Sequence, residues 1–353
     1  MKRDVLDRGL LASRKTVLAL SMVLISSLAQ ADTVTGTLNV YSVNEEPFLA
    51  EFMPVFKAKY PELKVNVIHG SGGPILARVL AEKSNPQADV ILSLPGSSLV
   101  ILQKQGLLDA YKTTEAEHLK PHMTDREPGG PQWTPVDAFG SAICFNKAEA
   151  EARNAPTPTK WSDLTSPAYK GQIVMPNPAS SGTGLLMVAN WFQLLGEEGA
   201  WSYMDKLHEN VAQYLHSGSA PCRMAASGEA IIGLSYPNIG VQSINAGAPL
   251  AVILPEEGNG AEIEGNAILK GAKNVEAAKL LIDFMATEDA QKIAGKYYAV
   301  LARKGVASTT AANYPANEEE KMNFFDYNWL AANKDRILAE WQKRYGGKSA
   351  PKK

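Results

Sequence analysis

The sequence predicts an α/β protein with two lobes. β-rich and helical segments alternate three times between residues 37 and 109, with short connections that favour a parallel sheet covered by helices. The chain has 353 residues, which suits two domains of ordinary size after an N-terminal export segment. Residues 121–136 are rich in proline and glycine and separate this alternation from a second run of elements. Each lobe is therefore expected to hold a mostly parallel sheet flanked by helices.

The three alternations open the mature chain. Phe48, Phe52, Val55 and Phe56 recur with the spacing of an apolar helix face, while the stretches around them are β-rich and alternating. We expect strands at residues 37–43, 63–70 and 88–94, and helices after residue 46, at 73–83 and at 97–109.

The remaining elements follow in a less regular order. They are a strand at residues 139–147, a strand within 160–178, a helix at about 185–195, a strand–loop–helix–strand over 210–237, two strands within 248–272, a helix pair within 274–306 and a helical tail beyond 315. From this order we assign residues 32–136 and about 250–300 to lobe 1. Residues 137–249 and about 301–353 are assigned to lobe 2.

The N-terminus carries the pattern of an export signal. Basic residues cluster before residue 16, an apolar stretch covers residues 17–28, and Ala29-Gln30-Ala31 follows. This order is typical of a cleavable secretory signal peptide, here residues 1–31. The apolar stretch is shorter than the roughly 20 residues that a spanning helix needs. We therefore expect an exported, soluble mature chain, with an uncleaved anchor as the alternative.

Charge and cysteine content narrow the classes of function. The chain has a formal net charge of −2, and removal of residues 1–31 takes away more positive than negative side chains. A mildly acidic protein lacks the basic face that nucleic-acid binding needs. Cys144 and Cys222 are the two cysteines. They can pair in an oxidising compartment or stay as buried thiols, and the sequence leaves both open.

Three loops share one composition: each follows an expected strand, precedes an expected helix and consists largely of Ser, Thr and Gly. They are His69–Ile75, Asn177–Gly184 and His216–Cys222, with Leu92–Ser98 as a weaker fourth. Helix N-termini offer free N–H groups to anions, and glycine lets a ligand approach the backbone. Ligands of open α/β sheets bind at the carboxyl ends of the strands. The loops of two lobes are therefore expected to face one ligand cleft.

Each loop also has a plainer interpretation as a helix cap, because Ser and Thr are common caps. The loop at residues 177–184 lacks the Gly-Lys-Ser/Thr ending of a nucleotide-binding P-loop. His216 and Ser217 lack the Gly-x-Ser-x-Gly context of a serine nucleophile, so we expect no catalysis. The histidines show no metal-ligand spacing, and no metal or cofactor is expected.

Several stretches together resemble a known family. They are "LNVYS" at the start of the mature chain, "ADVILS", "FNK", "YKGQIVMPNPASSGTG", "SGEAIIGLS" and "NAILKGAKNVEAAKLLIDFMATEDAQ". In this order they resemble periplasmic solute-binding proteins of ABC importers with the type II two-lobed fold, over nearly the whole mature chain. The resemblance implies a monomeric periplasmic receptor, not an enzyme, that delivers a small ligand to an inner-membrane ABC permease.

Within this family the sequence resembles the 2-aminoethylphosphonate branch, near binders of hexose phosphates and of ferric iron. Ferric relatives carry a His where this chain has Glu45, a Glu where it has Leu94 and a Tyr-Tyr pair where it has Tyr236-Pro237. A hard trivalent cation needs anionic oxygen ligands, so iron is disfavoured. Sugar-phosphate relatives follow the equivalent of His216 with an acid, and Ser217 here favours a smaller ligand.

The resemblance implies a pocket that binds an organophosphonate, with a hexose phosphate as the alternative. The anionic group of the ligand is expected to contact Ser180, Ser181, Gly182 and Thr183. Ser71, Gly72 and Ser217 are expected on the opposite side of the pocket, and His216 is also expected to line it. Ser42, Asn44, Glu45 and Tyr236 are expected to meet the rest of the ligand. Pro237 stands where aminoethylphosphonate relatives often have an acid, which leaves Glu45 or Glu46 as a partner for the amine.

Overall fold

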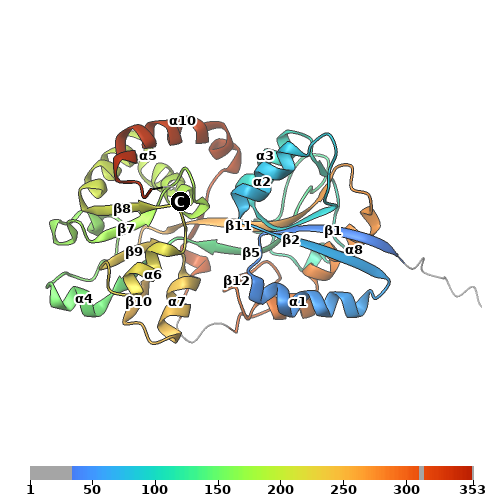
Figure 1. Cartoon of the computed structure of the whole chain (residues 1–353), viewed down its shortest axis with the longest axis horizontal. Coiled ribbons are helices and arrows are strands. Elements are labelled where there is room, and N and C mark those ends of the chain that lie inside the picture. Colours follow the sequence, from blue (N-terminus) through green and yellow to red (C-terminus); the bar gives the residue numbers. More distant parts are fainter. Residues whose placement is uncertain (1–33, 310–313, 352–353) are drawn as a thin grey trace, which may run out of the picture. The chain divides into compact units, whose positions relative to one another are not determined.

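The computed structural model describes residues 34–309 and 314–351, which form two β-sheets with helices packed around each (Figure 1). The predicted signal peptide, residues 1–31, lies outside the described residues. Among the helices that are described, none has the length and apolar character needed to cross a bilayer. The α/β class with two sheets flanked by helices is confirmed.

The first sheet contains the three predicted alternations. Its strand order is β12-β5-β11-β3-β1-β2, and β4 and β13 also pair with β11. β1 lies parallel to β2 and β3, whereas β11 runs antiparallel to β3 and β5. The bounds are Gly36–Ser42 (β1), Leu63–His69 (β2), Val90–Pro95 (β3), Leu108–Asp109 (β4), Thr134–Gly140 (β5), Asn259–Leu269 (β11), Val300–Leu301 (β12) and Met322–Phe324 (β13).

Helices with one buried apolar face pack on this sheet. They are α1 (Glu46–Lys59), α2 (Gly72–Ala81), α3 (Gly96–Lys104), α8 (Val275–Ala286) and α9 (Glu288–Ala294). Three residues of the predicted face of α1, Phe48, Phe52 and Phe56, have no exposed surface, but Val55 is 42% exposed and does not belong to the buried face. Burial of such side chains is the main favourable contribution to folding. The strand ends that lead into α1, α2 and α3 are thereby held at one edge of the sheet.

The second sheet has the order β10-β6-β9-β7-β8. β7 is parallel to β8 and β9, while β6 is antiparallel to β9 and β10. Both sheets are thus mixed rather than mostly parallel. In each sheet, a strand next to a crossing between the sheets, β11 in the first and β6 in the second, runs antiparallel to neighbouring strands. The bounds are Ala142–Asn146 (β6), Ile173–Pro176 (β7), Val211–Leu215 (β8), Ile232–Ser235 (β9) and Leu250–Ile253 (β10).

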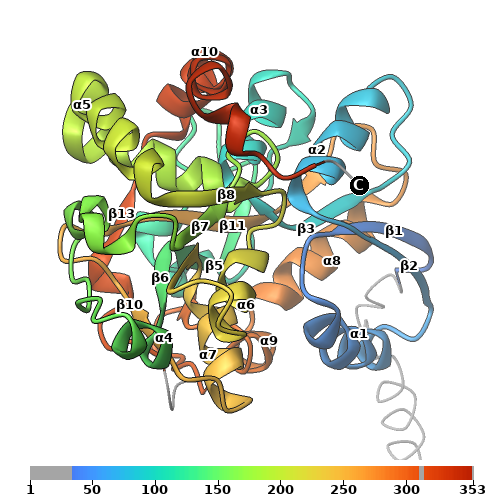
Figure 2. The same cartoon turned by 60° about the vertical axis from the view of Figure 1, so that its left-hand side comes forward.

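Helices also pack around the second sheet (Figure 2). They are α4 (Lys147–Ala152), α5 (Gly182–Asn210), α6 (Ala220–Ala226), α7 (Pro237–Asn245) and α10 (Tyr327–Tyr345). The helix predicted at 185–195 is the first half of α5, which breaks at Gly196, where φ is 69°. Trp191 from α5 and Trp341 from α10 are fully buried in the core of this sheet.

The chain passes between the sheets through β5 and β6 and again between β10 and β11. The predicted boundary between residues 136 and 137 falls inside β5. Strand pairing also places β10 in the second sheet and β13 in the first. The predicted lobe limits had assigned the residues of β10 to lobe 1 and those of β13 to lobe 2. Local sequence patterns reveal strands but not their partners, and the partners decide sheet membership.

Candidate ligand-binding site

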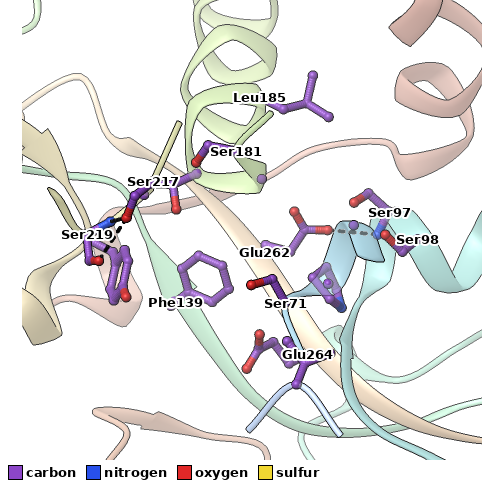
Figure 3. A pocket seen from close by; sticks show the side chains of 18 of the residues that line it. Ser71, Ser97, Ser98, Phe139, Ser181, Leu185, Ser217, Ser219, Glu262 and Glu264 are labelled. Atoms are coloured by element: carbon purple, nitrogen blue, oxygen red, sulfur yellow. Dashed lines mark hydrogen bonds between the residues drawn. The ribbon is translucent and has the colours of Figure 1, made fainter. Parts of the chain in front are cut away.

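A pocket of about 730 Å³ lies where loops from both sheets meet, and all four Ser/Gly loops line it. Figure 3 shows serines from both sides of this pocket, with Phe139 between them. The predicted ligand-binding residues that line it are Glu45, Ser71, Gly72, Ser180, Ser181, Gly182, Thr183, His216, Ser217 and Tyr236. The structure therefore brings together residues that are far apart in the sequence.

The start of α5 is both a cap and part of the pocket wall. The Ser181 hydroxyl accepts a hydrogen bond from the Gly184 N–H at 3.4 Å, which confirms the cap interpretation. A Cβ at Gly184 would lie 2.7 Å from the Pro176 carbonyl oxygen, so the helix start packs directly on the end of β7. The N–H groups of the first turn are thereby held at the pocket, where the helix dipole favours an anion.

The loop before α6 touches the start of α5. A Cβ at Gly218 would lie 2.4 Å from the Thr183 Oγ1 atom and 3.2 Å from the Ser181 Oγ atom. Ser217 thus stands beside Ser181 on one side of the pocket, while Ser71 lies across from them (Figure 3). The prediction that Ser217 lies opposite Ser181 is wrong, because β7 and β8 are adjacent in the sheet and their loops emerge together.

The Ser217 hydroxyl closes a turn at this loop by accepting the Ser219 and Ala220 N–H groups, both at 3.3 Å. The Ser235 hydroxyl donates to the Gly218 carbonyl oxygen at 2.7 Å and holds the same turn. We call Ser180, Ser181, Thr183, Ser217 and Ser219 the hydroxyl pole of the pocket. Hydroxyls and backbone N–H groups of this kind bind anions through charge-assisted hydrogen bonds.

His216 joins the hydroxyl pole to the C-terminal segment. Its Nε2 atom lies 2.8 Å from the Ala350 carbonyl oxygen, and its Nδ1 atom lies 2.8 Å from the Ser180 Oγ atom. Because a carbonyl oxygen only accepts, Nε2 carries the hydrogen, and in the neutral ring Nδ1 accepts from the Ser180 hydroxyl. His216 therefore contacts Ser180 and not its sequence neighbour, and it sets the orientation of that hydroxyl.

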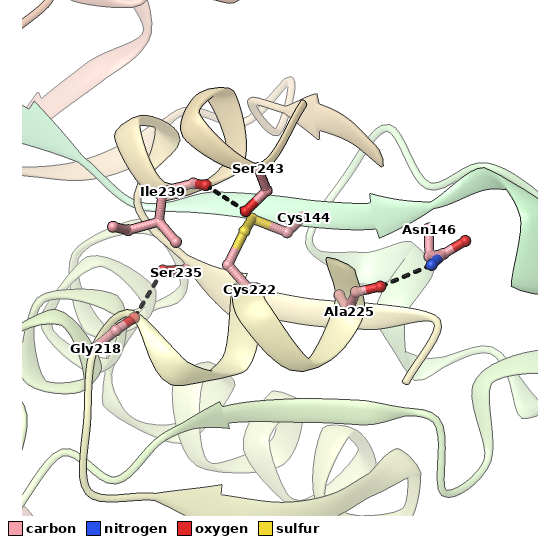
Figure 4. The surroundings of a disulfide bond; sticks show 8 residues. All are labelled: Cys144, Asn146, Gly218, Cys222, Ala225, Ser235, Ile239 and Ser243. Atoms are coloured by element: carbon pink, nitrogen blue, oxygen red, sulfur yellow. Dashed lines mark hydrogen bonds between the residues drawn. A yellow bond between two sulfur atoms is a disulfide. The ribbon is translucent and has the colours of Figure 1, made fainter. Parts of the chain in front are cut away.

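A disulfide holds α6 to the second sheet (Figure 4). Cys144 on β6 and Cys222 on α6 are bonded, with their Cα atoms 5.3 Å apart. Both cysteines are fully buried. The choice that the sequence left open is thus decided by the fold. Since α6 directly follows the Ser217–Ser219 turn, the bond also anchors the hydroxyl pole.

Ser42 and Asn44 do not line the pocket and are almost fully buried, so the structure does not support their predicted contact with the ligand. The Asn44 side chain turns inward and donates to the Ser93 hydroxyl at 2.7 Å and to the Tyr298 hydroxyl at 3.2 Å. The buried polar groups satisfy each other there. Tyr298 lines the pocket in their place.

Tyr236 does line the pocket and also packs edge-on against Phe139, with ring centroids 6.0 Å apart. Burial raises the pKa of the Tyr236 hydroxyl and of the Tyr298 hydroxyl above the ordinary range. Both hydroxyls are therefore neutral at physiological pH. Glu45 lines the pocket and is exposed, whereas Glu46 points to His69, 3.8 Å away, and lies outside it.

Acidic side chains in the pocket were missed from the sequence. Glu262 and Glu264 of β11 and Glu318 line the pocket, and Asp137 of β5 is the cross-strand partner of Glu264. We call Asp137, Glu262, Glu264 and Glu318 the carboxyl pole. The stretch "AEIEG" was the available signal, because residues two apart in a strand share one face. Burial raises the pKa of Glu262 and of Asp137 to about 7, and that of Glu264 well above its usual range.

Comparison with known proteins shows the family to which this chain belongs. Residues 85–333 match the family described as bacterial extracellular solute-binding protein. A probable ABC transporter periplasmic-binding protein of Sinorhizobium fredii is 26% identical over 310 residues, covering 86% of this chain and 83% of that protein.

Solved structures agree with this match. The periplasmic binding protein AfuA from Actinobacillus pleuropneumoniae, solved with fructose-6-phosphate bound, is 30% identical with a TM-score of 0.77, covering 88% of this chain and 99% of that one. Iron-bound HitA from Pseudomonas aeruginosa has a TM-score of 0.74 at 21% identity, covering 86% and 98%, and shows the shared fold alone.

Proposed function

Because this chain belongs to the bacterial extracellular solute-binding proteins and is the substrate-binding component of an ABC importer, we propose that it captures a small organophosphonate. The best candidate is 2-aminoethylphosphonate. With the predicted signal peptide, the receptor would work in the periplasm and deliver its ligand to an inner-membrane permease. It would act by binding alone, without a cofactor.

One observation carries this proposal: the pocket has a hydroxyl pole on one side and a carboxyl pole on the other. A phosphonate suits the hydroxyl pole because Thr183 and its neighbours offer donors at the start of α5, where the helix dipole adds attraction. An amine at the other end of the ligand suits the carboxyl pole. A small zwitterion uses both.

Capture would include closure of the two lobes over the ligand. The hydroxyl pole belongs to loops of the second sheet, while Ser71, Ser97 and Ser98 belong to loops of the first. A ligand that contacts both sets of loops stabilises the closed state relative to the open one. The strands that connect the sheets, β5–β6 and β10–β11, are where such a hinge would bend.

A hexose phosphate is the second candidate. The relative solved with fructose-6-phosphate bound is 30% identical and covers most of this chain, which favours a phosphate ester of similar size. Ser217 favours a smaller ligand, because it has no carboxylate that could bind sugar hydroxyls. Its own hydroxyl accepts hydrogen bonds within the turn before α6.

Calorimetric titration with 2-aminoethylphosphonate, inorganic phosphate and glucose 6-phosphate tests the proposal. We expect 2-aminoethylphosphonate to bind most tightly. Tighter binding of glucose 6-phosphate would establish the second candidate, and no binding of the three would overturn both. Turnover of any of these solutes would contradict a pure receptor, and a coloured complex on loading with Fe³⁺ would support the disfavoured ferric receptor.

The Thr183→Ala variant tests the hydroxyl pole. Loss of a hydrogen bond to a charged group should weaken phosphonate binding roughly 10- to 100-fold. The melting temperature should stay unchanged, because Ser181 and not Thr183 provides the cap. Thr114→Ala, at an exposed position outside the pocket, is the matched control. Equal loss of melting temperature and affinity would make Thr183 a structural residue only.

A further inference from the structure

The carboxyl pole has no ion-pair partner among the described residues. Asp137 and Glu318 are 1% and 6% exposed, and within the described part of the chain one buried carboxylate oxygen of each, Oδ2 and Oε2 respectively, has no hydrogen-bond partner. Among residues 34–309 and 314–351, no lysine, arginine or histidine forms an ion pair with any of the four acids of the carboxyl pole. The ion pairs of these residues all involve other acids: His69–Glu46, Arg78–Glu82, Lys120–Glu319, His122–Glu319, Arg153–Glu149, Lys160–Glu256, Lys279–Glu276, Lys292–Glu288, Lys296–Glu51, Arg303–Glu115, Arg336–Glu197, Lys343–Glu340, Arg344–Asp205 and Arg344–Glu340. Buried acids of this kind are unfavourable unless they are neutral or paired.

Asp137 and Glu264 lie directly opposite each other on β5 and β11. As directly opposed residues, their side chains project from the same face of the sheet. Desolvation raises the pKa of Asp137 to about 7 and that of Glu264 well above its usual range, so without a cation the pair holds a proton. A ligand cation that reaches Glu264 would take the place of this proton.

The position of Glu264 allows this. Glu264 lines the pocket together with Glu262 and Glu318, whereas Asp137, its cross-strand partner, does not line it. Figure 3 shows Glu264 and Glu262 on the side of Ser71, Ser97 and Ser98, across Phe139 from the hydroxyl pole. The Oε1 atom of Glu262 already accepts the Ser97 N–H at 2.7 Å. Glu264 is also partly exposed, whereas Glu262 and Glu318 are buried, so Glu264 is the member of the pole most accessible to a ligand.

We propose that Glu264, supported by Asp137, is the subsite for an alkylammonium group of the ligand, while the hydroxyl pole holds its anionic group. This assignment rests on the proposed phosphonate function and identifies the residue that would select amino-phosphonates over plain ones. An ammonium group donates up to three hydrogen bonds, and carboxylates that have lost their shared proton only accept. In this assignment Glu264 takes the role that the sequence left to Glu45 or Glu46.

Two probes separate the ammonium from the anion: 2-aminoethylphosphonate, and ethylphosphonate, which lacks the amine. Wild-type protein should bind the amino compound at least about tenfold more tightly. Glu264→Gln should remove most of this preference, and it should leave ethylphosphonate affinity unchanged or increase it, because a negative charge is lost. Equal weakening of both probes, or no change with either, would overturn the assignment.

The controls keep structural effects apart. Glu256→Gln changes an exposed acid that pairs with Lys160 outside the pocket and should alter neither affinity. Thermal melting verifies that each variant folds. If Glu264→Gln does not fold, Asp137→Asn carries the same test, since it removes the carboxylate that supports Glu264.

A failure of the phosphonate function can be told apart from a failure of this subsite. If the wild type binds neither phosphonate, the proposed function is wrong, and putrescine, a cation without phosphorus, becomes the probe. Putrescine binding that Glu264→Gln abolishes would uphold the ammonium subsite. No putrescine binding, or binding unaffected by the variant, would overturn the subsite as well.

Discussion

Reduction of the Cys144–Cys222 disulfide should strongly destabilise the protein. The bond joins residues 78 positions apart and encloses β7, α5 and β8. Closing a loop of that length removes chain entropy from the unfolded state worth about 4.5 kcal/mol at 25 °C. Reduction adds two hydrogens and removes no heavy atom, so the core around the buried sulfurs changes little. The entropy of the unfolded chain should therefore dominate the effect.

The measurement is urea unfolding followed by circular dichroism. Because both sulfurs are buried, the protein is first unfolded in a thiol reductant and then refolded in it. The free energy of unfolding, extrapolated to zero urea, should fall by about 4.5 kcal/mol relative to the oxidised protein. The Cys144→Ala/Cys222→Ala double variant is the control, and it should be indifferent to the reductant.

Two results would refute this reasoning. One is an equal free energy of unfolding for the oxidised and the reduced protein, which would mean that the bond does not constrain the unfolded chain. The other is titration of two free thiols in the unfolded protein without reductant, which would mean that the exported chain does not form the bond.

Two further predictions follow from the pocket. Gly218→Ala places a Cβ 2.4 Å from the Thr183 Oγ1 atom, so the two loops must separate, and calorimetry should show phosphonate binding weakened roughly 10- to 100-fold. Gly347→Ala has open space around the added carbon, and a similar loss there would contradict this explanation. Glu262→Gln should become more stable than the wild type as pH rises. Burial raises the pKa of Glu262 from 4.5 to about 7, so its contribution to stability is present below about pH 4.5 and is lost as pH rises through 7. Urea unfolding at pH 4.5 and 8 should show a relative gain of up to about 3 kcal/mol for the variant, and a constant difference would refute the shift.

The loops that form the hydroxyl pole were largely predictable from sequence. The loops at residues 177–184 and 216–222 combine small hydroxyl residues with glycine between a strand and a helix, and these local signals require no knowledge of distant contacts. The structure brings both loops to one pocket. Their functional role stays a prediction, together with the identity of the ligand.

The acid side was not predictable in the same way. Glu262 and Glu264 share a strand face, but a strand shows only that alternate residues point the same way, not whether that face meets solvent or a pocket. Asp137 is far from both in sequence and meets Glu264 only through the pairing of β5 with β11. Ser42 and Asn44 follow a strand like the other candidates, yet they turn inward to Ser93 and Tyr298.

The sequence by itself determined the α/β class, the positions of most strands and helices and the Ser/Gly loops at strand ends, because these depend on periodicity and residue type within a few positions. The predicted export signal rests on the same local evidence. The tertiary structure alone decided the bond between Cys144 and Cys222, the membership of β10 and β13, and the contact of Gly218 with Thr183. It also decided the carboxyl pole opposite the hydroxyls. Each of these depends on which distant segments pack together, and that is set by burial of the whole chain rather than by any local pattern.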